Sequence, residues 1–164
     1  MKQQGVTLVE LMIVLLIIGL IAVAASPFTS AWVKDAKVSE GASAVEEAIG
    51  RAKAAALRNT ARVTGDKPAS RVCFSSSEVK VVVPATPTQE VKCDLTPVWT
   101  AKLSDVVTVK TFKDKDDTPS TWSCSCFNNK GLAITDSANC NECSTNLNFK
   151  FGHTGVDSDE RSFY

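Results

Sequence analysis

The sequence predicts an α+β fold in which one long N-terminal helix packs on a small antiparallel β-sheet. The first part of the chain is almost entirely apolar, and apolar residues then recur at steps of four and three. In the C-terminal half the apolar residues alternate with polar ones, with a period of two. A helix followed by a run of strands is typical of an α+β domain. Eighteen basic residues balance eighteen acidic ones, so the net charge does not favour a nucleic-acid or acidic partner.

The N-terminal apolar segment is long enough to cross a membrane. From Leu11 to Ala25 there is no charged or strongly polar side chain. Counted from Val6, the segment has the ~20 residues that a helix needs to cross a ~30 Å hydrocarbon core. Lys2 is the only charged residue ahead of it, which favours a cytoplasmic N-terminus. We therefore expect residues 6–27 to span the membrane and the bulk of the chain to lie outside the cytoplasm.

Glu10 is the unexpected residue of this segment. A charged side chain at the centre of a membrane helix costs ~3 kcal/mol on insertion scales, and less toward the ends. A secretory signal cleaved after Ala22-Val23-Ala24 would place Glu10 beside its apolar region. A simple signal anchor accounts for the length of the segment but not for the acid.

A third interpretation accounts for the glutamate. The stretch "GVTLVELMIV" resembles the class III signal of type IV pilins and pseudopilins. The resemblance implies that a prepilin peptidase cuts after Gly5 and methylates the new N-terminus at Val6, where the family usually has Phe. It also implies that Gly19 and Pro27 are kink positions in the N-terminal helix. In this family the glutamate, here Glu10, pairs with the free amine of a neighbouring subunit.

The chemistry of the two groups agrees with that pairing. A free α-amino group has a pKa of ~7.7–8, so it is mostly cationic near neutral pH. A buried charge destabilises its site unless it has a partner. We expect Glu10 to be poorly satisfied in the bilayer and to be neutralised beside Val6 of another copy, which drives assembly and sets its register.

Residues 28–59 are predicted to continue the helix in amphipathic form. One apolar stripe runs along it: Val38, Ala42, Val45, Ile49, Ala52 and Ala56. The stripe fits either a coiled-coil seam or the face on which a sheet packs, and the sheet is favoured. We expect a helix from about Val6 to about Asn59, an exit loop over residues 60–70, and a disulfide-braced β domain over residues 60–164.

Four segments of the C-terminal half are predicted strands: "RVCF", "EVKVVV", "VVTVKTF" and "LNFKF". The segments "AKAAALRNTARV", "SRVCFSSSEVKVVV" and "CFNNKGLA" resemble the GspH/FimT branch of minor pilins and pseudopilins. This resemblance implies a minor subunit, with a major pilin or another minor subunit as the alternatives.

The chain has six cysteines: Cys73, Cys93, Cys124, Cys126, Cys140 and Cys143. An even number behind an export-type segment favours disulfides. We expect Cys73 to pair with Cys93 and the last four to form two bridges, for which three connectivities remain open. A Cys₄ zinc site on the last four is the alternative.

No catalytic signature is found, so neither an enzyme nor a cofactor is expected. His153 is the only histidine and is expected to be solvated. Acidic runs at residues 114–117 and 157–160 lack the spacing of an EF-hand calcium loop.

Direct DNA binding is weakly supported, because the C-terminal "GVDSDERSFY" is mostly acidic. The residues that would carry it cluster around the helix exit: Arg51, Lys53, Arg58, Arg62, Lys67 and Arg71.

The sequence thus predicts a structural pilin-like subunit, inserted in the bacterial inner membrane and then assembled into a periplasmic or extracellular filament. Its expected partners are other pilin subunits, the prepilin peptidase, the inner membrane and the pilus assembly machinery. The filament is a type IV pilus, a competence filament or the pseudopilus of a type II secretion system. The competing class is a membrane-anchored binding domain that never polymerises.

Overall fold

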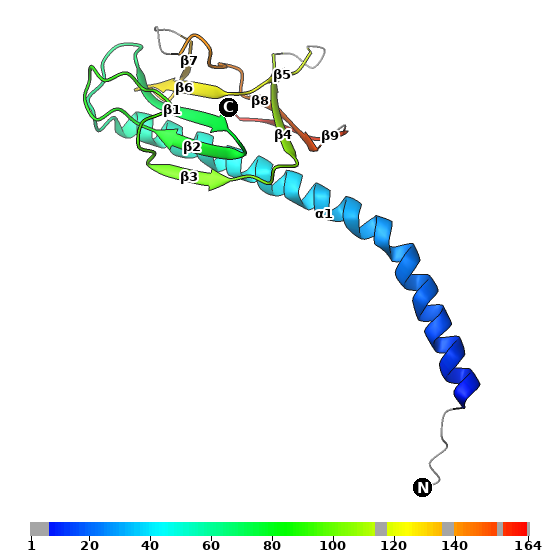
Figure 1. Ribbon diagram of the computed structural model, residues 1–164. Coiled ribbons are helices and arrows are strands. Elements are labelled where there is room, and N and C mark those ends of the chain that lie inside the picture. The colour runs from blue at the N-terminus through cyan, green and yellow to red at the C-terminus, as the bar shows by residue number, and fades with distance from the viewer. Residues whose placement is uncertain (1–6, 114–117, 136–139, 154–155, 164) are drawn as a thin grey trace. The chain divides into compact units, whose positions relative to one another are not determined.

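The computed structural model describes residues 7–113, 118–135, 140–153 and 156–163 (Figure 1). The side chains of residues 24–29 and 156–158 also lie outside the described set. The chain divides into two compact units, Met1–Lys34 and Asp35–Tyr164.

One helix, α1 (Leu8–Arg58), links the two units in sequence. Its C-terminal end is set by Asn59, which adopts a left-handed conformation with φ of 44° and donates its backbone N–H to the Ala55 carbonyl. The Asn59 side chain then bonds both the N–H and the carbonyl of Val63, which turns the chain away from the helix. The predicted helix from about Val6 to about Asn59 is therefore close to the observed one.

Within the described residues, nine strands form two antiparallel sheets rather than the single sheet expected. The strands are β1 (Pro68–Ser75), β2 (Glu78–Val82), β3 (Trp99–Lys102), β4 (Val107–Phe112), β5 (Ser120–Thr121), β6 (Cys124–Asn128), β7 (Ala133–Ile134), β8 (Asn148–His153) and β9 (Val156–Ser162). One sheet has the order β3-β2-β1-β6-β7 and the other the order β5-β4-β8-β9. The four predicted strands correspond to β1, β2, β4 and β8.

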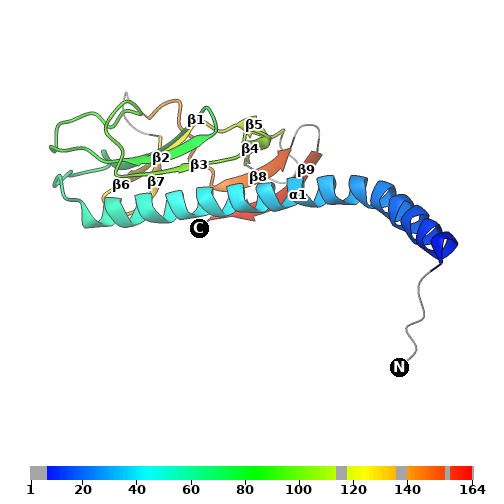
Figure 2. The ribbon, with the colours of Figure 1, turned by 60° about the horizontal axis from the view of Figure 1, so that its bottom comes forward.

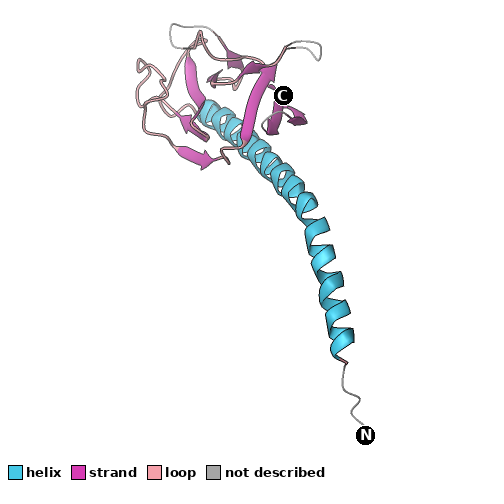
Figure 3. Cartoon of the chain, turned by 45° about the vertical axis from the view of Figure 1, so that its right-hand side comes forward, coloured by secondary structure: helices cyan, strands magenta, loops and turns pink. Residues whose placement is uncertain are grey.

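The apolar stripe of α1 is buried under the sheets, which answers the choice between a coiled-coil seam and a packing face. All six stripe residues are at most 2% exposed. They share one core with residues of both sheets, among them Val72 of β1 and Phe149 of β8. The Ser70 hydroxyl of β1 donates to the Ala52 carbonyl at 2.7 Å, which joins sheet and helix directly. Figures 2 and 3 show the strands gathered along the C-terminal half of the helix.

Gly41 permits the close approach of α1 to strand β4. A Cβ added there would lie 2.9 Å from Val107 Cγ1 and 3.5 Å from Leu103 Cδ2. We expect Gly41→Ala to destabilise the domain by about 1–2 kcal/mol, because overpacking outweighs the ~1 kcal/mol gain in helix propensity. Equilibrium urea unfolding followed by tryptophan fluorescence measures the change.

Gly50 provides the matched control, since it lies in the same helix and a Cβ there meets nothing within 4 Å. Gly50→Ala should therefore stabilise the domain by about 1 kcal/mol. Equal signs for the two variants would contradict the packing explanation.

Candidate functional site

The first turn of α1 contains two residues of the predicted signal. The Thr7 hydroxyl accepts the backbone N–H of Glu10 at 3.3 Å, and the Thr7 carbonyl accepts that of Leu11 at 3.2 Å. Thr7 is thus the N-cap of the helix, and Glu10 is the third residue of its first turn. An acid at this position interacts favourably with the helix dipole. The Thr-x-x-Glu spacing is a capping-box signal, and the capping role of Thr7 was missed by sequence reasoning.

Every side chain described from Leu8 to Val23 is exposed. The large apolar ones range from 47% exposure at Val14 to 77% at Val23. Glu10 is exposed among them and is the only charged residue in this stretch. The surface is therefore a continuous apolar cylinder with one acidic group near its N-terminal end.

The other predicted residues of this segment have different outcomes. Gly5 and Val6, the predicted cleavage and methylation residues, lie outside the described residues. Helix α1 continues through Gly19 and Pro27, so neither residue ends it, and a kink at either stays a prediction. In the described part of the chain, no helix meets the requirements of length and apolar character for a membrane span.

All six cysteines form disulfides, as the sequence predicts, and none is free. Cys73 pairs with Cys93, Cys124 with Cys143, and Cys126 with Cys140. The structure thereby selects one of the three connectivities left open for the last four. The sulfurs of Cys126, Cys140 and Cys143 lie within 4.8 Å of one another. Because each belongs to a disulfide, these sulfurs are not the thiolates that zinc requires, and the zinc alternative is wrong for this state.

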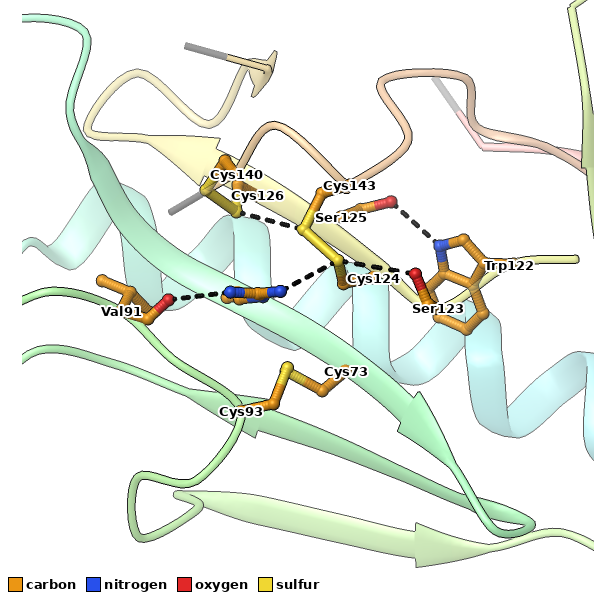
Figure 4. Close-up of a disulfide and its surroundings, with 11 residues drawn as sticks. Cys73, Val91, Cys93, Trp122, Ser123, Cys124, Ser125, Cys126, Cys140 and Cys143 are labelled. Atoms are coloured by element: carbon orange, nitrogen blue, oxygen red, sulfur yellow. Dashed lines mark hydrogen bonds between the residues drawn. A yellow bond between two sulfur atoms is a disulfide. The ribbon is translucent and has the colours of Figure 1, made fainter. Parts of the chain in front are cut away.

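The disulfides gather on one face of the first sheet. Cys73 of β1 lies opposite Cys124 of β6, and Arg71 lies opposite Cys126. Residues directly opposite each other, and residues two apart on one strand, share a face of the sheet. These four side chains therefore point away from the face that carries Val72, which is buried in the core with the helix. Figure 4 shows the three bridges over this outer face.

Arg71 lies among the disulfides, half-buried. Its Nη1 donates to the Val91 carbonyl at 3.2 Å and its Nη2 to Cys124 Sγ at 3.1 Å. Burial lowers the pKa of the Arg71 guanidinium from its ordinary value, and the carboxylates of Glu142 and Asp94 act in the opposite direction. Sequence reasoning had placed Arg71 in a surface cluster, because a charge pattern does not reveal that a strand position is covered by loops.

Three of the six basic residues near the helix exit have partners within the domain. Arg51 pairs with Glu47 at 2.7 Å and lies over the Trp99 ring. Lys53 lies over the Phe127 ring, and Arg71 points into the disulfide cluster. The structure therefore does not support the continuous basic surface that DNA binding would need.

The structure describes only part of the two acidic runs. The run at 114–117 lies outside the described residues. The run at 157–160 lies in β9, where Asp159 pairs with Arg161 and Glu160 with Lys150. As neighbours on a strand, Asp159 and Glu160 point to opposite faces and cannot converge on one ion. His153, the last residue of β8, is partly exposed.

Comparison with known proteins finds one match. Residues 1–26 match the prokaryotic N-terminal methylation motif. No curated protein and no solved structure matches the chain. The matched residues include Gly5, Val6 and Glu10, together with the capped first turn and the whole exposed apolar stretch from Leu8 to Val23. The chain thus carries the N-terminal methylation motif that is the signature of type IV pilins and pseudopilins, on an α+β fold of the type IV pilin kind.

Proposed function

We propose that this protein is a structural pilin-like subunit, of the minor pilin type, of a type IV pilus or a related secretion or competence filament. Its precursor is held in the bacterial inner membrane by residues 6–27. A prepilin peptidase removes residues 1–5 by cutting between Gly5 and Val6, and Val6 is methylated. The processed chain then enters the filament through its N-terminal helix, and the β domain faces outward.

The exposed apolar helix is the observation that carries this proposal. From Leu8 to Val23 the apolar side chains lack cover, whereas the stripe from Val38 to Ala56 is buried by the chain's own sheets. Exposed apolar surface of this extent marks a site of association with protein or lipid. Lipid and protein both fit the proposed sequence of events. The helix contacts lipid in the precursor and the helices of other copies after assembly.

The assignment as a minor subunit rests on the resemblance to the GspH/FimT branch, and one local feature supports it. In the Phe-x-x-x-Gly turn, Phe127 is fully buried and Gly131 has φ of +73°. The turn residues Gly131 and Leu132 bond back to Asn128, which closes the β6–β7 hairpin. Glycine is favoured at this backbone conformation, which gives the motif a physical reason.

Mass spectrometry of the N-terminus in the native host tests the proposal. We expect the mature chain to begin at methylated Val6. A chain that begins at Met1, or after Ala24, would show that the segment is an anchor or a secretory signal instead.

Two variants sharpen the measurement. Gly5→Leu should abolish cleavage and leave the first five residues on the chain. Gly19→Ala changes a glycine of the same segment with open space around it, so it should be processed normally. Recovery of the processed chain in sheared filaments separates a filament subunit from an anchored domain that does not polymerise.

A further inference from the structure

Two disulfides of the outer face touch each other. Cys126 Sγ lies 3.6 Å from Cys143 Sγ, although each is bonded to a different cysteine (Figure 4). Neither sulfur carries a hydrogen in the bridged state, so the two are in direct sulfur–sulfur contact. Cys126 and Cys143 are both buried, at 0% and 5% exposure. A thiolate at Cys126 would therefore meet the Cys143 sulfur before any thiol from solution.

The sulfur of Cys124, which is bonded to Cys143, has hydrogen-bond donors directed at it. Cys124 Sγ accepts Arg71 Nη2 at 3.1 Å, and the Ser123 hydroxyl lies 3.8 Å from the same sulfur. A neighbouring guanidinium lowers the pKa of a thiol, because it stabilises the thiolate. A thiolate of lower pKa is also the better leaving group in thiol–disulfide exchange. Cys124 is thus placed to leave as a stabilised thiolate.

We propose that Cys126, Cys143 and Cys124 form an internal thiol–disulfide exchange site, with Arg71 as the residue that stabilises the departing thiolate. The Cys126 thiolate forms a bond to Cys143 Sγ while the bond between Cys143 and Cys124 breaks. The electron pair of the broken bond leaves on Cys124, where the Arg71 guanidinium faces it. One disulfide and one thiolate are present before and after the step, so it consumes no oxidant or reductant.

The Cys126–Cys140 bridge prevents the exchange while it is intact. The exchange operates only while Cys126 is free, which occurs before that bridge is oxidised or after a dithiol reductant opens it. Closing the bridge removes the attacking thiolate and fixes the Cys124–Cys143 pairing. A thiol–disulfide oxidoreductase is the class of partner that would open or close it. This inference does not depend on the proposed role in a filament.

The variant Cys140→Ser tests the exchange, because it leaves Cys126 permanently free. The purified full chain in detergent is quenched with acid, alkylated in denaturant and analysed by peptide mass spectrometry. We expect one alkylated thiol per molecule, divided between Cys124 and Cys126. Alkylation of Cys126 alone would overturn the proposal, and alkylation of Cys73 or Cys93 would overturn it too, since the exchange would not be confined to these residues.

The role of Arg71 is tested by adding Arg71→Gln to the Cys140→Ser variant. We expect the ratio of Cys124 to Cys126 thiol to fall about tenfold, because a charged hydrogen bond to the thiolate is lost. Arg71→Lys keeps the charge and should restore most of the ratio. An unchanged ratio in the Gln variant, or no rescue by Lys, would overturn the assignment of Arg71.

The variant Cys124→Ser supplies a matched control, because the exchange then uses the same contact between the sulfurs of Cys126 and Cys143. It leaves Cys143 free to attack Cys126, so the departing thiolate is now Cys140 rather than Cys124. Arg71 Nη2 donates to Cys124 Sγ, and Cys124 is not the departing group of this reaction. Arg71→Gln should therefore leave the ratio of Cys140 to Cys143 thiol unchanged within about twofold. An equal tenfold change in this background would mean that Arg71 only maintains the fold, and would overturn its role at Cys124.

Discussion

Glu10→Ala is expected to abolish incorporation of the processed subunit into filaments without preventing its cleavage. In the proposed filament, the Glu10 carboxylate neutralises the amine of Val6 on a neighbouring copy. Removing one partner of a buried ion pair costs about 3–5 kcal/mol, because the other charge is left unpaired. That cost corresponds to a loss of about a hundredfold or more in the equilibrium for adding a subunit. The amount of subunit in sheared filaments, relative to processed subunit in the membrane, measures the effect.

Glu40→Ala is the matched control for this experiment. Glu40 is an exposed acid further along the same helix, so its removal should leave incorporation at the level of the parent chain. Normal incorporation of Glu10→Ala would contradict the pairing with Val6.

A second role of Glu10 has to be separated from the first. In the first turn of α1, an acid contributes only about 0.3–1 kcal/mol through the helix dipole. The Thr7 cap uses the Glu10 backbone N–H, which alanine retains. Helix content measured by circular dichroism should therefore be almost unchanged in Glu10→Ala. A large loss of helix would attribute the assembly defect to helix formation rather than to pairing.

Helix α1 and its packing face could be predicted from the sequence, because apolar residues spaced at steps of three and four are enough to indicate both. The stripe from Val38 to Ala56 is apolar on one side only, and the sheets bury that side. Strands β1, β2, β4 and β8 were likewise predicted from apolar patterning. Each contains a short apolar or alternating segment next to turn residues.

Strands β6 and β9, which sequence reasoning missed, lack that alternation for identifiable reasons. Every residue of β6 is buried, because Phe127 faces the core while Cys124 and Cys126 lie under the disulfide loops. Strand β9 carries the charged residues Asp159, Glu160 and Arg161, which are satisfied by ion pairs rather than by burial. In the sequence alone, the residue pattern of neither strand can be distinguished from that of a loop.

The disulfide pairing and the place of Arg71 depend on contacts across strands. The register between β1 and β6 puts Arg71, Cys73, Cys124 and Cys126 on one face. The return of the chain over that face is fixed by the Ser144 N–H, which donates to the Cys124 carbonyl at 2.8 Å. These contacts join residues distant in sequence, so cysteine spacing could limit the pairings but not select one.

Trp122→Ala is expected to cause the largest loss of stability among substitutions in the β domain. The Trp122 side chain is 1% exposed and lies between Phe74 and Phe149, with ring centroids 5.8 Å and 5.0 Å away. Its Nε1 donates to the buried Ser125 hydroxyl at 3.1 Å. Loss of a buried tryptophan typically costs about 3–5 kcal/mol, a large part of the 5–15 kcal/mol that stabilises a typical domain. Thermal unfolding followed by circular dichroism should show the melting temperature lowered by about 10 °C or more.

Two further variants separate the contributions at this site. Trp122→Phe keeps an aromatic ring between Phe74 and Phe149 but removes the donor to Ser125, so its cost should lie between those of the parent chain and Trp122→Ala. Trp32→Ala removes a tryptophan that is 74% exposed, and it should change the unfolding free energy of the β domain by less than about 0.5 kcal/mol. Similar losses at Trp32 and Trp122 would contradict a core that depends on Trp122. A loss confined to position 122 is the result expected of a ring that packs between the two sheets, because Phe74 lies in β1 and Phe149 in β8.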